Sequence, residues 1–181
     1  MSEPVRPADP TKIEVAEAFM YTCPHCYHFD PLISSWMKKQ QSDVVLVQTH
    51  IAFNPSVEPY QRAYYTAVAL KIKDKAHIDI FKAIHVSHQE FGTPESWATF
   101  LSQYGVTKEA VLSTYNSFGV TSQVNQANAR QRGFKISSTP QLVVDGRYSI
   151  SSRLEGGHEA MLKVAQFLVE KVRAERAAAA K

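Results

Sequence analysis

The sequence predicts an α/β fold in which a sheet layered with helices is interrupted by an all-helical insertion. Three observations predict it. Apolar residues alternate in a strand-like manner from Lys12 to Met20 and again after Pro140. Between residues 54 and 133 the apolar spacing is helical throughout. The only two cysteines of the 181 residues, Cys23 and Cys26, stand where the first strand-like run gives way to a helical one.

The composition excludes several classes of protein. An apolar content of 44% is sufficient for a hydrophobic core, and the net charge of +3 comes from scattered lysines and arginines, so nucleic-acid binding is not expected. No apolar stretch reaches the ~18 residues of a transmembrane helix. The first residues form a polar, proline-rich arm without a visible signal peptide, so the chain is either cytosolic or a mature form whose targeting segment was removed. A monomer is the expected state.

The first strand contains an acid whose environment has two interpretations. Alternation places Ile13, Val15, Glu17 and Phe19 on one face of the strand. Glu17 is then either a solvent-facing residue near a strand end or a buried acid close to the two cysteines. We favour the buried acid, because its neighbours on that face are apolar.

The first helix begins at the cysteines. Cys23 is expected at or next to the N-cap and Pro24 at the first helical position, where a missing N–H costs nothing. We expect a kink at Asp30-Pro31, because proline removes one helical hydrogen bond. Two lysines, Lys38 and Lys39, are expected to close the helix with the charge that its C-terminus favours.

The second strand is expected over residues 44–53, and its first four residues, 44–47, have a fully buried character. A right-handed crossover through the first helix would make the first two strands parallel.

The insertion is expected to contain five helices. We expect them over residues 58–73, 74–90, 94–104, 108–118 and 121–132, with threonine N-caps at Thr93 and Thr107 and ends at three glycines. Its aromatic residues are most simply its core: Trp97, Phe100, Tyr104 and Phe118. His85 and His88 are expected on a solvated helix face rather than as metal ligands.

The chain ends with a hairpin and a long helix. Residues 141–144 and 147–150 flank Asp145-Gly146, a pair typical of a tight hairpin turn. The last helix is expected over residues 157–176, with a frayed tail at 177–181. The predicted domains are therefore residues 1–53 together with 134–181, and an inserted helical domain at 54–133.

Two cysteines two residues apart at a helix start predict a redox dithiol. Unpaired N–H groups and the helix dipole favour an anion at the first sulfur, which makes Cys23 the nucleophile and Cys26 the resolving thiol. His25 is placed to donate to the Cys23 thiolate, and Pro24 stiffens the turn. No metal site is expected, because a zinc site of this kind needs a second ligand pair, and no cofactor is indicated.

A second element precedes the hairpin, at Ser138-Thr139-Pro140. A proline at the first residue of a strand is a candidate for a cis bond, although this pattern alone leaves the isomer open. A cis proline beside the dithiol would let the Thr139 backbone pair with a substrate peptide.

These motifs together resemble the family of DsbA-type thiol:disulfide oxidoreductases. The resemblance covers nearly the whole chain from residue 12 and is carried by Cys23-Pro24-His25-Cys26-Tyr27, residues 19–29, 50–53 and 144–148, the helical insertion, and Thr139-Pro140. It implies a thioredoxin-like fold with an inserted all-helical subdomain. It also implies a nucleophilic Cys23, a resolving Cys26, a cis Thr139–Pro140 bond, and Glu17 in proton transfer near Cys26.

The resemblance further implies a function and a place. The Cys23–Cys26 disulfide would be donated to folding secreted or periplasmic proteins through a mixed disulfide. The location would be the periplasm, with reoxidation by a quinone-linked membrane partner of the DsbB type. Two departures stand out: the family's best-known members have a lysine where this chain has Gln48, and an additional strand where this chain has its short arm.

Two other functions remain open from the sequence. A low pKa of the first cysteine is typical of an oxidant, whereas a pKa of about 7 is typical of a thioredoxin-like reductase or isomerase. A peptide-binding, chaperone-like module with an incidental dithiol is the third alternative.

Overall fold

The computed structural model describes residue 7 and residues 9–179, and most of the predicted extended arm lies outside them. The chain forms two compact units. One contains Met1–Phe19, His28–Thr49 and Arg130–Lys181, and we call it the sheet unit. The other contains Met20–Tyr27 and His50–Ala129, and we call it the helical unit. The chain therefore passes between the units several times, and the dithiol segment belongs with the helices.

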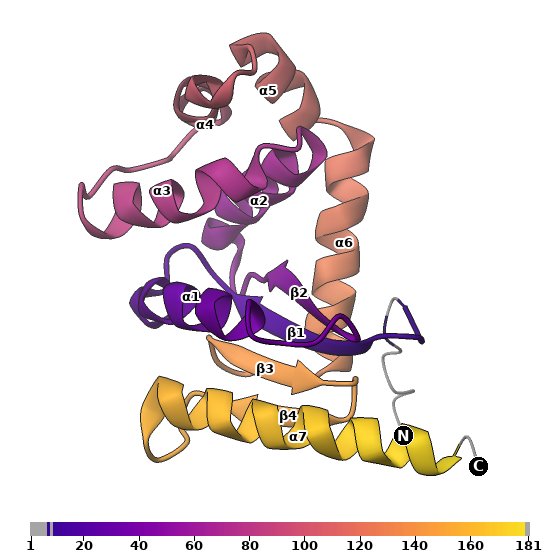
Figure 1. The fold of residues 1–181 in the computed structure, drawn as a ribbon. Coiled ribbons are helices and arrows are strands. Elements are labelled where there is room, and N and C mark those ends of the chain that lie inside the picture. The colour runs from indigo at the N-terminus through magenta and orange to yellow at the C-terminus, as the bar shows by residue number, and fades with distance from the viewer. Residues whose placement is uncertain (1–6, 8, 180–181) are drawn as a thin grey trace. The chain divides into compact units, whose positions relative to one another are not determined.

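Within the described part of the chain, the sheet has four strands in the order β2-β1-β3-β4 (Figure 1). They are β1 (Ile13–Phe19), β2 (Val44–His50), β3 (Gln141–Val144) and β4 (Tyr148–Ser151). β3 is antiparallel to both β1 and β4. The Ile13 amide donates to the Asp43 carbonyl at 2.7 Å, which brings the starts of β1 and β2 together, as a parallel pair requires.

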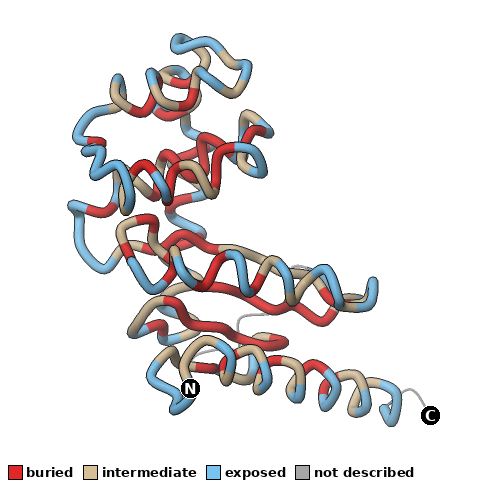
Figure 2. The backbone as a smooth tube through the Cα atoms, turned by 60° about the vertical axis from the view of Figure 1, so that its left-hand side comes forward, coloured by how far each residue is buried: buried red, intermediate tan, exposed pale blue. Residues whose placement is uncertain are grey.

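The burial of each strand follows from its place in this order. All seven residues of β1 are buried, since β1 has neighbours on both sides (Figure 2). The interior of β2, by contrast, is only half-buried over residues 45–48, so the predicted fully buried run is wrong. Over the described residues β2 is an edge strand, with a neighbouring strand on one side only. It also ends at His50, three residues before the predicted end.

Helix α1 (Pro24–Met37) begins at the predicted residue. Pro31 lies inside this helix and does not end it. The last turn of α1 contains no basic residue, which contradicts the predicted closure by Lys38 and Lys39. These lysines follow Met37, where the N–H of Lys38 still reaches the Ser34 carbonyl at 3.3 Å.

Helix α7 (Gly157–Ala179) packs against the sheet and closes the core of this unit (Figure 1). The core joins all of these strands to α1 and α7 through Ile13, Val15, Phe29, Ile33, Val44, Leu142, Val144, Ile150, Met161, Ala165, Val169 and Val172. The helix continues to Ala179, so the predicted fraying from residue 177 is wrong over the described residues. Alanine has the highest helix propensity, which explains the extension.

The helical unit is built from α2 (Glu58–Ala69), α3 (Lys73–His85), α4 (Pro94–Leu101), α5 (Lys108–Tyr115) and the first part of α6 (Phe118–Gly133), with short 3₁₀ turns at Pro55–Val57 and Ser102–Tyr104. The predicted caps are confirmed. The Thr93 side chain accepts the Ser96 amide in a capping box, and the Thr107 side chain accepts the Ala110 amide. Local side-chain chemistry thus sets where these helices begin.

The aromatic core of this unit is only partly the predicted one. Trp97 is fully buried and stacks on Phe91 with ring centroids 4.0 Å apart, whereas Phe100 and Tyr104 are half-buried. Phe118 is 87% exposed, so its predicted place in the core is wrong. The reason is a helix boundary: α5 ends at Tyr115, and Phe118 is the first residue of α6, with Gly119 inside that helix.

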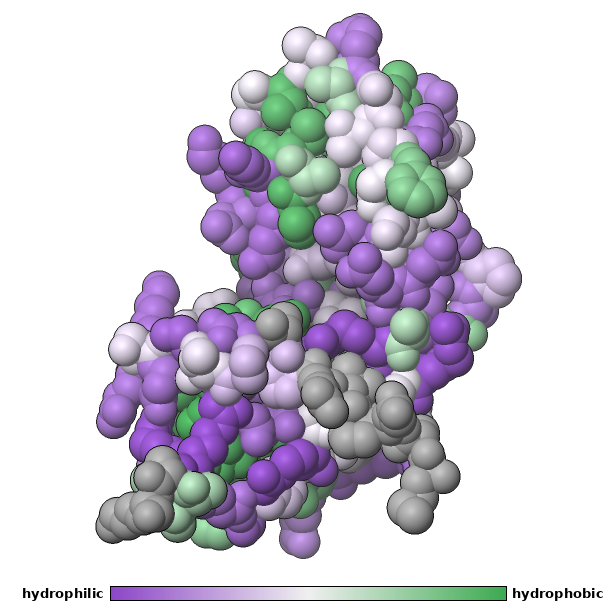
Figure 3. Space-filling model, turned by 90° about the vertical axis from the view of Figure 1, so that its right-hand side faces the viewer, coloured by the Kyte–Doolittle hydropathy of each residue, from purple (hydrophilic) through white to green (hydrophobic). Residues whose placement is uncertain are grey.

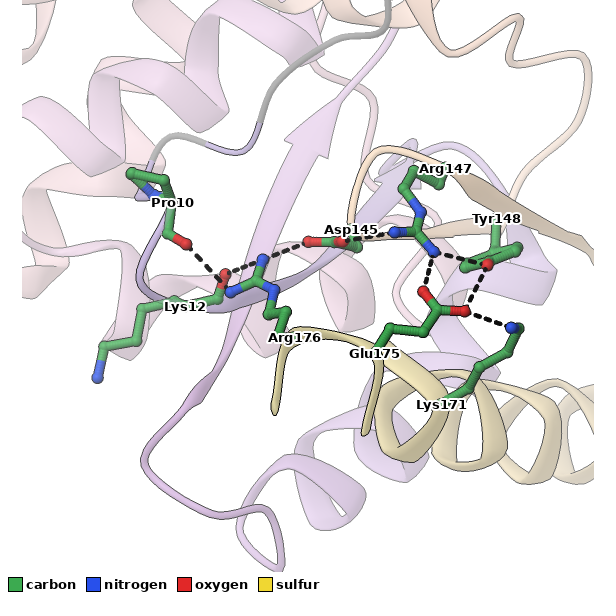
Figure 4. Close-up of polar contacts among 8 residues, drawn as sticks. All are labelled: Pro10, Lys12, Asp145, Arg147, Tyr148, Lys171, Glu175 and Arg176. Atoms are coloured by element: carbon green, nitrogen blue, oxygen red, sulfur yellow. Dashed lines mark hydrogen bonds and ion pairs between the residues drawn. The ribbon is translucent and has the colours of Figure 1, made fainter. Parts of the chain in front are cut away.

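A network of charges links the β3–β4 turn to α7. The predicted hairpin turn is confirmed, and Asp145 and Gly146 both have positive φ, 55° and 66°, as a type I′ turn requires. Figure 4 shows how the turn meets the helix through six side chains that we call the clasp: Asp145, Arg147, Tyr148, Lys171, Glu175 and Arg176. Arg176 donates to Asp145 at 2.6 Å and to the carbonyls of Lys12 at 3.1 Å and Pro10 at 3.0 Å. The clasp therefore also holds the chain just before β1.

Candidate active site

Cys23 occupies the N-cap of α1, where its carbonyl and its sulfur both accept hydrogen bonds. The carbonyl accepts the amides of Cys26 at 3.1 Å and Tyr27 at 3.2 Å. The Cys26 amide also lies 3.4 Å from Cys23 Sγ, within hydrogen-bonding distance for sulfur. Behind it, the Cys23 amide donates to the Met20 carbonyl at 3.1 Å and closes a turn. The first sulfur is thus held at the positive end of a helix, as the sequence predicts.

The two cysteines differ in burial. Cys26 is completely buried, whereas Cys23 retains 9% exposure, and Pro24 and His25 between them are exposed. An incoming thiol therefore has access to Cys23 rather than to Cys26. A donor role of His25 toward Cys23 stays a prediction.

Glu17 is buried in the sheet unit with an exposure of 1%, so its expected burial is confirmed and the solvent-facing interpretation is wrong. Its closeness to the two cysteines stays a prediction. Gln48 Nε2 donates to Glu17 Oε2 at 3.0 Å and lies 3.5 Å from Asp30 Oδ1. Asp30 is also buried, with an exposure of 7%. The side-chain amide of Gln48 thus contacts two buried carboxyl groups. The sequence did not reveal Asp30, because only the fold brings it to Gln48.

The Thr139–Pro140 peptide bond is cis, as the family resemblance implies. Pro140 is buried and Thr139 is half-buried, directly before β3. The preceding loop is tied to this strand, because the Ser137 amide donates to Gln141 Oε1 at 3.2 Å, and Gln141 Nε2 donates to Ser149 Oγ at 2.7 Å.

The predicted site residues are divided between the two units. The helical unit contains Cys23, Pro24, His25 and Cys26, and the sheet unit contains Glu17, Thr139 and Pro140. Among the described residues, no three histidine, cysteine, aspartate or glutamate side chains lie close enough to hold a metal ion. None of the helices in the same part of the chain is long and apolar enough to span a membrane.

Sequence reasoning missed a group of histidines next to the dithiol segment. His85 is half-buried, its Nε2 lies 2.8 Å from the Tyr21 carbonyl oxygen, and its ring stacks on Tyr27. Its predicted place on a solvated face is therefore wrong, while His88 beyond the helix end is exposed. His50 is completely buried, and this burial lowers its pKa to about 3. Only the spacing of His77 and His85 toward one side of α3 could have signalled this group.

Comparison with known proteins identifies the relatives of this chain. A family model described as the DSBA-like thioredoxin domain matches residues 14–162. The thiol:disulfide interchange protein DsbA of Pseudomonas aeruginosa is 39% identical over all 181 residues, which span 84% of that relative. The protein of the same name from Azotobacter vinelandii is 39% identical over 92% of this chain and 78% of its own length.

Solved structures agree with these relatives. The crystal structure of Pseudomonas aeruginosa DsbA superposes with a TM-score of 0.90 at 39% identity, covering 100% of this chain and 93% of that one. The oxidoreductase DsbA from Xylella fastidiosa superposes with a TM-score of 0.87 at 34% identity, over 93% of this chain and 91% of the other. The similarity therefore includes both the sheet and the helices.

Proposed function

This chain belongs to the family of DsbA-like thioredoxin-domain proteins and is a thiol:disulfide oxidoreductase, and we propose that it acts as an oxidant through a nucleophilic Cys23. The fold is thioredoxin-like with added helices. The observation that carries the proposal is the place of Cys23 Sγ at the start of α1, 3.4 Å from the Cys26 amide. A thiolate there is stabilised by the helix N-terminus, which makes Cys23 a good leaving group and its disulfide oxidising.

The proposed reaction proceeds in two exchanges. A substrate thiolate attacks Cys23 Sγ, the Cys23–Cys26 bond breaks, and Cys26 leaves as a thiolate while a mixed disulfide forms on Cys23. A second substrate thiolate then attacks the substrate sulfur of that mixed disulfide and releases Cys23 as a thiolate. The substrate gains a disulfide, and two electrons remain on Cys23 and Cys26.

We propose that Glu17 transfers a proton at the buried Cys26 thiolate. The hydrogen bond from Gln48 Nε2 to Glu17 Oε2 supports a role of Gln48 in holding this acid. Gln48→Lys tests this role, because a cation between the carboxyl groups of Glu17 and Asp30 would favour their ionised forms. The rate of disulfide transfer should then acquire a different pH profile. An unchanged profile in both Gln48→Lys and Glu17→Gln would refute the role.

The proposed roles of Thr139, Pro140 and His25 are based on the resemblance to the DsbA family. Thr139 and Pro140 are proposed to receive the substrate backbone, and His25 to donate to the Cys23 thiolate. The proposed domains are residues 1–53 with 134–181 and the inserted residues 54–133. They are supported by unit boundaries at 49/50 and 129/130, although residues 20–27 group with the helices.

We propose that the substrates are reduced proteins folding in the periplasm. The proposed mature chain has lost a signal peptide and acts as a monomer, and a membrane quinone reductase of the DsbB type would reoxidise it. The similarity to relatives named thiol:disulfide interchange protein DsbA supports these assignments.

A redox titration against glutathione tests the proposed direction of the chemistry. An oxidant of the DsbA type has a potential of about −120 mV, whereas a reductant such as thioredoxin has one of about −270 mV. The thiolate absorbance of Cys23, followed in a Cys26→Ser variant, should titrate well below the usual range of a cysteine. A thioredoxin-like potential together with a Cys23 pKa at or above about 7 would refute the oxidant. Full activity of Cys23→Ser would instead favour the chaperone-like alternative.

A further inference from the structure

Tyr21 lies two residues before Cys23 and is completely buried in the helical unit. Each of its three polar groups contacts a different histidine. The Tyr21 amide donates to His50 Nε2 at 3.0 Å. The Tyr21 carbonyl oxygen lies 2.8 Å from His85 Nε2, and the hydroxyl lies 2.8 Å from His77 Nδ1. We call these four residues the Tyr21 cluster.

The rings of the cluster are packed as well as hydrogen-bonded. The Tyr21 ring lies 5.1 Å from His50, 5.3 Å from His77 and 5.0 Å from Phe81, measured between ring centroids. On the other side of the dithiol, Tyr27 stacks on His85 at 5.4 Å with an interplanar angle of 11°. His85 therefore contacts the residues before and after the two cysteines.

The hydrogen bonds assign definite protonation to two of the histidines. His50 accepts an N–H at Nε2, which only the unprotonated nitrogen can do. Burial supports this neutral form, because it lowers the pKa of His50 to about 3. His85 faces a carbonyl oxygen, so its Nε2 carries the proton and donates. The Tyr21 backbone is thus held by one acceptor and one donor that match its two groups.

The position of Tyr21 connects the cluster to the reactive sulfur. Tyr21 is inside the turn that the Cys23 amide closes on the Met20 carbonyl. A rotation of this turn would move the Cys23 backbone and weaken the 3.4 Å contact between Cys23 Sγ and the Cys26 amide. Displacements of about 1 Å at a reacting atom are sufficient to lower rates substantially.

We propose that Tyr21, His50, His77 and His85 are positioning residues that fix the turn leading into Cys23, so that the helical unit controls the reactivity of the dithiol. This inference rests on the proposed function in one respect, namely that Cys23 is the attacked sulfur. It assigns the inserted helices a role in tuning the chemistry, through α3 above all.

Two substitutions of His85 separate its hydrogen bond from its ring. His85→Phe keeps a ring to stack on Tyr27 and removes the donor to the Tyr21 carbonyl. His85→Gln keeps a donor and removes the ring. Tyr21→Phe is the most conservative variant, because it retains the ring packing and removes only the hydroxyl contact with His77. His88→Asn is the matched control: it removes an exposed histidine, and asparagine tolerates the positive φ of 51° at this residue.

The readouts are the thiolate titration of Cys23, its rate of alkylation by iodoacetamide at pH 5, and the reduction potential against glutathione. His85→Phe should lower the alkylation rate about fivefold, the factor that corresponds to losing one hydrogen bond, and shift the thiolate titration upward. His85→Gln should stay within about twofold of the wild type, because its donor restores that bond. His88→Asn should match the wild type.

Native-like thiolate titration, alkylation and potential in both His85→Phe and Tyr21→Phe would overturn the proposal. A His85→Gln variant as impaired as His85→Phe would also overturn the assignment to the hydrogen bond. Urea unfolding of each variant establishes that it is folded, and Tyr21→Phe keeps the test decisive if His85→Phe unfolds. If the wild-type protein had a reduction potential like that of thioredoxin, its proposed function as an oxidant would be refuted. The ratios of alkylation rates between the variants and the wild type would still test the role of the Tyr21 cluster.

Discussion

The Tyr21 cluster and the clasp have the same structural role but differ in the charge and the exposure of their side chains. Each ties a tight turn to a helix, at Met20–Cys23 in one case and at Asp145-Gly146 in the other. In the Tyr21 cluster His50 and His77 are buried and His85 is half-buried, and burial lowers the pKa of His50 to about 3. In the clasp, hydrogen bonds from Lys171 and Arg147 lower the pKa of Glu175 to about 2.

The difference between the two regions follows from their access to water. The Glu175 and Arg147 side chains are 36% and 44% exposed, so water and salt screen their charges. Figure 3 shows a predominantly hydrophilic surface on the sheet unit beside α7. The Tyr21 amide, by contrast, is held by His50, a completely buried and neutral side chain that salt does not screen. We therefore expect the Tyr21 cluster to be sensitive to acid and the clasp to be sensitive to salt.

The largest change in the free energy of unfolding is expected at acidic pH, where His50 becomes protonated in the unfolded chain. Its pKa is about 3 when folded and about 6.5 when unfolded, so between these values the unfolded chain binds a proton that the folded chain does not. The stability from neutral His50 is complete above about pH 6.5 and is lost as the pH falls toward 3, at roughly 1.4 kcal/mol per pH unit.

Urea unfolding at pH 7, 6, 5 and 4 measures this loss. His50→Gln has no titrating side chain, so its stability should fall less steeply with pH than that of the wild type. If the stabilities of the wild type and of His50→Gln fell equally with pH, the expected acid sensitivity of the Tyr21 cluster would be wrong.

A smaller effect is expected from removing the cation at the centre of the clasp. Arg176→Ala removes hydrogen bonds to Asp145, Lys12 and Pro10 and leaves Asp145, only 9% exposed, with the more distant Arg147 at 3.8 Å. The free energy of unfolding should fall by about 2 kcal/mol, measured from urea midpoints. Lys163→Ala, an exposed residue of the same helix, is the control. Equal midpoints for the two variants would show that the clasp contributes no stability.

The smallest effect is expected from Glu175→Gln, since exposed ion pairs contribute little. Its urea midpoint should shift less than that of Arg176→Ala, and raising salt from about 0.05 M to about 1 M should remove the difference from the wild type. The low pKa of Glu175 means that this stability is complete above about pH 4.5 and is lost only as the pH falls toward 2. If the urea midpoints of Glu175→Gln and the wild type still differed at high salt, the expected salt sensitivity of the clasp would be wrong.

Local chemical signals explain what could be predicted from the sequence. The start of α1 at Pro24, the caps Thr93 and Thr107, and the Asp145-Gly146 turn each depend on a few adjacent residues, and all are confirmed. The boundary between α5 and α6 was missed because Gly119 suggested a helix end where it lies inside a helix. A methyl group at position 119 would contact only the Ser117 hydroxyl, at 3.6 Å. The packing around Gly119 therefore does not indicate where α5 ends and α6 begins.

Long-range partners explain what could not be predicted. Arg130 donates to Glu14 across 116 residues at 2.5 Å, and Gln48 reaches Glu17 only because β2 lies beside β1. No spacing rule connects His77 on α3 with Tyr21 before α1, although they are 2.8 Å apart. The reactive cysteines could therefore be identified from the sequence, while the residues that hold their segment could not.

The division of the chain into interleaved segments has a consequence for biogenesis. The helical unit is complete in sequence at Ala129, whereas β1 must wait for its partner β3, which starts at Gln141. Val15 and Val144 meet only after nearly the whole chain has been synthesised. In a chain that emerges from its N-terminus, all of the segments that surround the reactive cysteines within the helical unit are therefore available before the sheet can close.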